Sequence, residues 1–421
     1  MPPASSWSPA AVRHRSHRMA SGISRARAAL FRVAALCLWT ALCPGSPALA
    51  NCPFCPSLSP TLSEQAATRS VTALASWSSG VRPAGENQGS TTFELLQIGR
   101  GKDLGPKAGS SVTLAPFRGG QPGDLFLLWG DGTDVIDWAP PVEFSETAWH
   151  YLTQFPAREA TTAVRLKYCL RFLEFPDDII ARDAYEELAS ARYEDIAALQ
   201  PHLPGSRLLE IVADRTVPEQ RLGLYGLLLG LSRAEGAAAL LRQRIMQNPE
   251  DDAAFGLDGL LGGYLLLTGS DGLDLLEQQF LGEPPTTFAR RLALLRAVEF
   301  FWTYETSRFA RSRLIASVRQ LLDDPATAER AVITLARWQD WTIRPRLMQL
   351  AFDKGFGTAR DRRILRRAIV GYLLAAEQVE PADPELQAAA AQDLQLIRQR
   401  DPATWRAATR LLRPQPAEKS P

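Results

Sequence analysis

Short hydrophobic runs alternate with glycine-rich turns between residues 51 and 144 of this chain. Runs of this length, bounded by turn-forming residues, are typical of β-strands in small antiparallel sheets. The sequence therefore predicts a small β-barrel or sandwich that is closed by Pro140-Pro141, with the wholly apolar run Leu125–Trp129 as an interior strand. The predicted strands are Val71–Trp77, Thr91–Ile98, Ser111–Phe117, Asp124–Trp129 and Val135–Trp138.

From residue 145 to residue 412 the apolar residues recur three and four positions apart, which is typical of amphipathic helices. The Ser145 hydroxyl can cap the first of these helices. Comparable apolar positions return every 34 to 39 residues, at Leu222, Leu257, Leu292, Ala331 and Leu365. This period is typical of α-solenoids, and we favour HEAT-like over tetratricopeptide repeats. The predicted fold is a multidomain α+β protein, whose clearest helical stretches are Phe288–Trp302, Ser307–Leu322, Ala328–Trp338 and Asp361–Ala376.

The first fifty residues have the pattern of a secretory signal. A basic stretch is followed by ten uncharged residues, Val33–Leu42, and the small-residue triplet Ala48-Leu49-Ala50 precedes Asn51. We expect cleavage before Asn51, with either Met1 or Met19 as the start. The apolar run is shorter than the roughly 20 residues of a membrane-spanning helix, and no later segment has a comparable run. We therefore predict export to the periplasm or extracellular space, without membrane insertion after cleavage.

Charge is unevenly distributed along the 421 residues, whose formal net charge is +1. Residues 1–50 carry six arginines and no acid, which leaves 41 basic and 46 acidic residues, a net charge of −5, in 51–421. A mildly acidic chain of this kind argues against a nucleic-acid binder, because such proteins normally carry a basic excess. The polar, proline-rich stretch 413–421 is predicted to be disordered.

Three cysteines remain after the predicted cleavage. Cys52 and Cys55 form the motif Cys-Pro-Phe-Cys, and in an oxidising compartment we expect them to form a structural disulfide. The alternatives are a thiol–disulfide exchange site, which would need a preceding strand and a helix N-terminus, and a structural zinc site, which would need two more ligands. Cys169 lies in an apolar helical stretch and is predicted to be buried.

The sequence contains no recognisable catalytic motif, so the catalytic residues stay unassigned and we expect no cofactor and no metal. His150 and His202 are the only histidines after the predicted cleavage, and we interpret them as surface or packing residues. Asp258 lies within a cluster of glycines, Gly256, Gly259, Gly262 and Gly263, whose spacing allows helices to approach closely. A buried carboxylate there is the candidate of an enzyme alternative, because toroidal all-α glycosidases carry carboxylates on such helices.

The densest basic cluster of the chain falls on one half of a predicted helix, opposite an apolar half. It comprises Arg360, Arg362, Arg363, Arg366 and Arg367. From this cluster we take Arg363 and Arg367 as candidate binding residues for an anionic partner. Trp341 is a third candidate, because an exposed tryptophan can bind a sugar. Trp338 instead continues an apolar stripe and is interpreted as a core residue.

Several strings taken together resemble a protein family. They are the signal, Cys-Pro-Phe-Cys, GDLFLLWG, RLGLYGLLLGL and GLDGLLGGYLLLTG. The set resembles exported proteins of planctomycete bacteria, a family with no established activity to transfer. A cysteine motif before a five-stranded barrel is also similar to netrin-like and metalloproteinase-inhibitor domains, which implies an OB or netrin-like barrel. Those inhibitors use Cys-x-Cys with a free amine on the first cysteine, whereas this chain has Cys-x-x-Cys after Asn51.

These patterns favour an exported scaffold or binding protein over an enzyme. Its helical-repeat surface would bind another protein or an envelope polymer. The alternatives are a glycosidase-like enzyme that uses Asp258 and a thiol–disulfide protein that uses Cys52 and Cys55.

Overall fold

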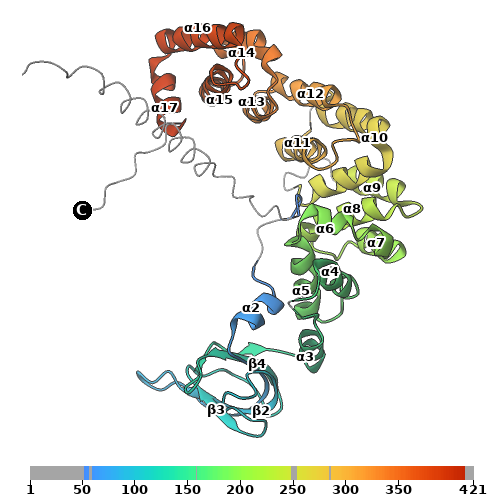
Figure 1. Cartoon of the computed structure of the whole chain (residues 1–421), viewed down its shortest axis with the longest axis vertical. Coiled ribbons are helices and arrows are strands. Elements are labelled where there is room, and N and C mark those ends of the chain that lie inside the picture. The colour runs from blue at the N-terminus through green and yellow to red at the C-terminus, as the bar shows by residue number, and fades with distance from the viewer. Residues whose placement is uncertain (1–51, 56–58, 158, 248–253, 284–285, 413–421) are drawn as a thin grey trace, which may run out of the picture. The chain divides into compact units, whose positions relative to one another are not determined.

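The structure is a computed structural model that describes residues 52–55, 59–157, 159–247, 254–283 and 286–412 (Figure 1). The predicted signal at 1–50 and the predicted tail at 413–421 lie outside the described residues. The short helix α2 (Leu62–Thr68) precedes a small antiparallel, nearly closed barrel-like sheet, and a long series of helices follows. The α+β class is thereby confirmed.

The sheet contains six strands in the order β3-β2-β1-β4-β5, with β6 paired to β4. Four of the five predicted strands are confirmed as β1 to β4, and the run Leu125–Trp129 lies in an interior strand as predicted. The third and the fifth are shorter than predicted, and β6 after Pro141 was not expected. The strands are β1 (Val71–Val81), β2 (Ser90–Arg100), β3 (Ser111–Leu114), β4 (Leu125–Asp131), β5 (Asp137–Trp138) and β6 (Val142–Glu143).

The two faces of the sheet belong to different hydrophobic clusters. Ala75 of β1 stands opposite Leu95 of β2 and Phe126 of β4, and these residues pack together on one face. The alternate residues Leu74 and Leu127 face the other way and pack against the helix that follows the sheet. Strand alternation therefore gives one cluster inside the sheet and a second between the sheet and the helices.

Fifteen described α-helices follow the sheet. The predicted cap is confirmed, because the backbone N–H of Ala148 donates to Ser145 Oγ at 2.9 Å. The four clearest predicted stretches correspond to α11, α12, α13 and α15, although α12 begins four residues later than predicted. The helices are α3 (Glu146–Thr153), α4 (Thr162–Leu170), α5 (Asp178–Ala189), α6 (Tyr193–Ala197), α7 (Gly205–Ala213), α8 (Glu219–Ser232), α9 (Ala237–Ile245), α10 (Leu257–Leu281), α11 (Phe288–Thr303), α12 (Arg311–Gln320), α13 (Ala328–Arg337), α14 (Arg344–Phe352), α15 (Ala359–Glu377), α16 (Pro384–Arg400) and α17 (Pro402–Leu412).

Glycines allow α8 and α10 to pack with their backbones in contact. A β-carbon added to Gly259 would lie 2.0 Å from the Gly223 carbonyl oxygen, and one added to Gly263 would lie 2.0 Å from that of Gly226. Only glycine fits at this separation. The close approach that the glycine spacing predicts is therefore present.

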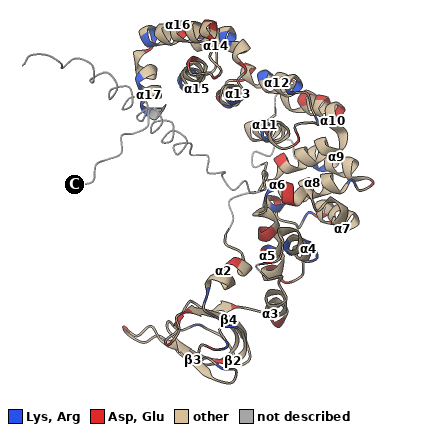
Figure 2. Ribbon diagram, in the orientation of Figure 1, with Lys and Arg blue, Asp and Glu red and all other residues tan. Residues whose placement is uncertain are grey.

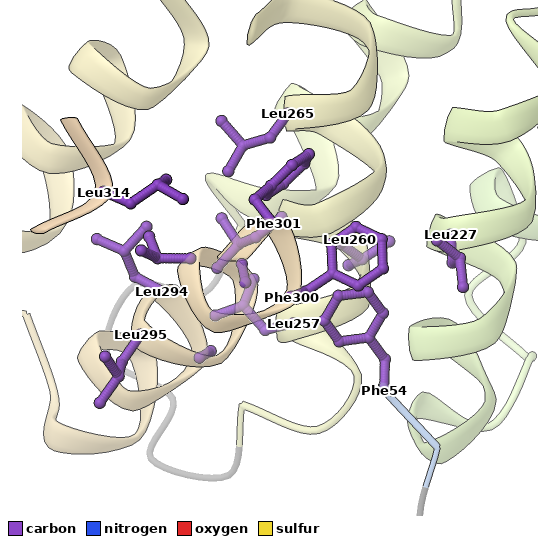
Figure 3. Close-up of a cluster of buried hydrophobic side chains, with 14 of the residues drawn as sticks. Phe54, Leu227, Leu257, Leu260, Leu265, Leu294, Leu295, Phe300, Phe301 and Leu314 are labelled. Atoms are coloured by element: carbon purple, nitrogen blue, oxygen red, sulfur yellow. The ribbon is translucent and has the colours of Figure 1, made fainter. Parts of the chain in front are cut away.

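The segment that contains the cysteine motif packs on the helices. The N–H of Cys52 donates to the Ala189 carbonyl at the end of α5, at 3.1 Å. Phe54 is buried in the helical core, where its ring lies 4.9 Å from that of Phe300 of α11 (Figure 3). Residues 52–55, which the sequence analysis grouped with the strands, are thus anchored to α5, α10 and α11.

Candidate functional site

The candidate site is built on α15, the helix that carries the basic cluster. A capping box begins this helix: the Asp361 N–H donates to Thr358 Oγ1 at 3.2 Å, and the Thr358 N–H donates back to Asp361 at 2.9 Å. Leu365, Ile369 and Leu373 then form its buried stripe. α15 packs against α13, α14, α16 and α17, and Figure 1 shows α13, α15 and α17 following one another along one side of α14 and α16.

Two of the five clustered arginines hold α15 to its surroundings. Arg366 donates from Nε to the Ala351 carbonyl and from Nη1 to Asp401, at 2.6 Å in both cases. Arg362 donates to the Gly357 carbonyl at 2.5 Å. Burial opposes ionisation of Asp401, but the hydrogen bonds from Thr404 and Arg366 outweigh it and lower the pKa of Asp401. These two arginines therefore have a structural role.

The other three arginines, Arg360, Arg363 and Arg367, are exposed. Within the described part of the chain, none of them forms an ion pair. Together with Ala403 and Thr404 of α17 they line a hollow of about 480 Å³. Elsewhere charges of both signs are interspersed over the helices (Figure 2), and the described residues form seventeen ion pairs in all. Three exposed arginines outside any ion pair therefore lie together on this surface.

A second hollow, of about 500 Å³, continues the first along α15 and is mainly apolar. Ile364 and Arg367 line both hollows. One wall is α13, where Ile333 is a large aliphatic side chain that remains 38% exposed. The remaining lining residues are Glu329, Ala336, Arg337, Ala368, Gly371, Tyr372 and Ala408.

Six of the α15 residues that line the two hollows form a single stripe. Positions 360, 363, 364, 367, 368 and 371 follow the three- and four-residue spacing of one helix face. At a rise of 1.5 Å per residue this stripe is about 17 Å long. We call this surface, the stripe with its walls on α13 and α17, the α15 groove. Its first half is basic and its second half is apolar.

The candidate residue Trp341 lies behind this groove rather than in it. It is half-buried, and its ring packs edge-on against that of Tyr372 at 5.0 Å. Tyr372 is held in place because its hydroxyl donates to the Asp340 carbonyl at 2.7 Å, and burial raises the pKa of that hydroxyl. The structure therefore brings Arg363 and Arg367 together in the groove and places Trp341 as a support for one of its lining residues.

The two cysteines of the motif form a disulfide, as predicted. Cys52 is only 4% exposed, and the loop between the sulfurs directs Phe54 into the core. Cys169 is fully buried in another part of the helical core, as predicted, and burial raises the pKa of its thiol.

The enzyme candidate Asp258 is 8% exposed and pairs with Arg296 at 3.4 Å. Burial raises the pKa of its carboxyl, and the charge of Arg296 opposes that shift. Its other oxygen accepts the Gly259 N–H at 3.0 Å. His150 and His202 are both exposed. Among the described residues, no cluster of three or more histidine, cysteine or acidic side chains could hold a metal ion.

α5 carries two buried carboxylates that were not predicted from the sequence. Asp183 accepts the Leu62 N–H at 2.6 Å and the Tyr151 hydroxyl at 2.9 Å. Glu187 accepts the Thr61 hydroxyl at 2.6 Å and pairs with Arg165 at 2.9 Å. The sequence pattern that could have predicted them is the four-residue spacing of two acids on an otherwise apolar helix face. They attach the start of α2 to α5.

A larger hollow, of about 770 Å³, lies between α2, the sheet and α3. Its two arginines already have protein partners: Arg100 donates to the Ala67 carbonyl at 2.6 Å and Arg165 pairs with Glu187. One guanidinium is ion-paired and the other is held by backbone carbonyls, whereas the α15 groove gathers three arginines outside any ion pair. We regard the α15 groove as the better candidate for recognition, although it is smaller.

Comparison with protein-family models, with curated proteins and with solved structures finds no match. None of the helices in the described ranges combines the length and apolar character needed to cross a membrane.

Proposed function

We propose that this chain is an exported scaffold that binds an acidic partner, either a protein or an envelope polymer, in the α15 groove. In this proposal the helices from α3 to α17 form HEAT-like repeats that hold the groove. The observation that carries it is the group of exposed arginines Arg360, Arg363 and Arg367, none of which forms an ion pair with a described residue. Exposed cationic side chains on one helix face attract anions over a Debye length of about 8 Å at physiological salt.

Two further features support a binding role. The hydrogen bond from Arg366 to Asp401 holds the start of α17, one wall of the groove, beside α15. Asp258, in contrast, is neutralised by Arg296, and Cys52 is buried. Neither residue is accessible to a substrate, whereas the arginines of the α15 groove are exposed. These positions support a binding role over a catalytic one.

The test uses the chain from Asn51 to Pro421 and two anionic probes, poly-L-glutamate and polygalacturonate. The variant Arg363→Ala/Arg367→Ala should bind the probes about tenfold more weakly than the parent. The control Arg182→Ala/Arg398→Ala removes two exposed arginines from α5 and α16 and should bind like the parent. Equal affinities of the two variants for both probes would refute the site.

Export is tested separately. The proposal expects the protein recovered from the producing cell to begin at Asn51 and to be found outside the cytoplasm. Recovery of a cytoplasmic chain that retains residues 1–50 would contradict export without bearing on the groove.

A further inference from the structure

We infer that the partner in the α15 groove is a protein segment with acidic residues at one end and an apolar face beyond them, and not a purely anionic polymer. This inference rests on the proposed function and specifies the chemical class of the partner. It follows from the two halves of the groove, which need different chemistry from a ligand.

The basic half defines one end of the ligand. Arg360, Arg363 and Arg367 are spaced three and four residues apart, so their guanidinium groups lie along one helix face. Carboxylates are matched to arginine because guanidinium can donate two parallel hydrogen bonds to them. A segment with two or three neighbouring acids would neutralise this half.

The apolar half disfavours acidic residues in the part of the ligand that lies there. Ile333, Ile364 and Ala368 contribute aliphatic surface there. The hydroxyl of Tyr372 is already used by the Asp340 carbonyl, and Arg337 already forms an ion pair with Glu299. Glu329 adds a negative charge at the α13 wall, which repels carboxylates. A polyanion would therefore lose favourable contacts over half the groove, whereas leucine-like side chains would gain them.

The dimensions fit a short helix. A stripe of about 17 Å corresponds to about eleven residues of α-helix. An amphipathic helix presents side chains every three and four residues, the spacing of the groove itself. Acids at the N-terminal end of such a helix are further stabilised by its dipole. The groove thus suits a helix whose first turn is acidic and whose following turns are apolar on one face.

The chain's own terminal stretches lack this chemistry. Residues 413–421 contain one acid, Glu418, against Arg413 and Lys419, and residues 1–50 contain no acid. Charge complementarity therefore favours a different protein as the occupant.

The probe is a synthetic fourteen-residue peptide with three glutamates in its first turn and leucines along one face of the remainder. One control peptide has the same composition in scrambled order, and another replaces the leucines by serine. We expect the amphipathic probe to bind the parent chain about tenfold more tightly than either control. Equal binding of all three peptides would overturn the inference.

A matched pair of variants localises the apolar contact. Ile333→Ser should weaken binding of the amphipathic probe about tenfold and leave binding of poly-L-glutamate unchanged. Val164→Ser alters a similarly exposed aliphatic residue on α4 and should leave both unchanged. If Ile333→Ser has no effect while Arg363→Ala/Arg367→Ala still weakens poly-L-glutamate binding, the inference fails and the proposed function stands. If the arginine variant also has no effect, both fail.

Two other occupants are distinguished by two further measurements. Removal of residues 413–421 should not change the affinity for the amphipathic probe, because the tail is not acidic. A marked gain in affinity would show that the tail occupies the groove and would overturn the inference. A self-association that is lost in Ile333→Ser, measured by sedimentation, would assign the groove to a second copy and would also overturn it.

Discussion

The Phe54 ring lies directly against Gly262 of α10. A β-carbon added to Gly262 would stand 2.7 Å from Phe54 Cζ, closer than real β-carbons approach a neighbour. The backbone of Phe54 is also close to α8, because a β-carbon on Gly223 would lie 2.4 Å from the Phe54 carbonyl oxygen. One aromatic residue of the cysteine motif thus fills the space left by glycines on two helices.

This packing makes Phe54 and Gly262 sensitive positions. Phe54→Ala should lower the free energy of unfolding by about 3 kcal/mol, because it leaves a cavity in a site that is 5% exposed. Gly262→Ala should lower it by about 1–3 kcal/mol through overpacking. Both changes are measured by urea denaturation. Gly119→Ala is the control, because no atom lies within 4 Å of its added β-carbon. A Gly262→Ala variant as stable as Gly119→Ala would contradict this packing.

The disulfide is expected to stabilise the chain and not to take part in thiol exchange. It closes a loop of only four residues, so removal of both cysteines by Cys52→Ser/Cys55→Ser should cost about 2 kcal/mol. Thiol labelling gives an independent readout. The folded chain from Asn51 should react with no label, because Cys169 is buried and the motif is oxidised. Denaturation without reductant should expose a single thiol. In a separate assay, catalysis of insulin reduction by the parent would refute the structural role of the disulfide.

The sequence was informative where a pattern depends on neighbouring residues. Strand runs, the Ser145 cap, the burial of Cys169 and the exposure of Arg363 and Arg367 all follow from local spacing and turn chemistry. β6 was missed because only Val142 and Glu143 pair with β4, which is too short a run to show alternation. The same limit applies to the shortened fifth strand.

Contacts between distant segments could not be predicted. Nothing near Phe54 in the sequence indicates that its ring packs on Gly262. The arginines of α15 look alike along the helix, yet Arg366 is held by Asp401 and Arg367 is not. That difference arises only when α17 docks beside α15. The roles of the two carboxylates on α5 were missed for the same reason, because their partners Thr61 and Leu62 lie more than 120 residues earlier in the chain.

The contrast between Arg366 and its neighbour can be measured. Arg366→Ala removes a charge-assisted hydrogen bond to Asp401 and one to the Ala351 carbonyl, and should lower the free energy of unfolding by about 2 kcal/mol. Arg367→Ala, one residue further on the exposed face, should change it by less than about 0.5 kcal/mol. Urea denaturation of the two variants decides this. Equal destabilisation would mean that Arg367 also has a structural partner.

The pH dependence of stability should report on Asp183. Burial raises the pKa of this carboxyl from an ordinary value near 3.8 to about 7, although hydrogen bonds from Leu62 and Tyr151 act in the opposite direction. The folded state therefore holds a proton more tightly than the unfolded state does. The resulting stabilisation is complete below about pH 4 and is lost as the pH rises to about 7, with a slope of about 1 kcal/mol per pH unit.

Asp183→Asn should remove that slope. The asparagine oxygen can still accept the Leu62 N–H, but the side chain no longer titrates. Urea denaturation at pH 5, 6, 7 and 8 compares the variant with the parent, and Asp271→Asn, an exposed carboxylate on α10, serves as the control that keeps the parental slope. Other groups that titrate in this range contribute equally to all three chains, so the difference isolates Asp183. If Asp183→Asn retained the full parental slope, Asp183 would be ionised in the folded chain throughout this range, and the attachment of α2 to α5 would not depend on pH.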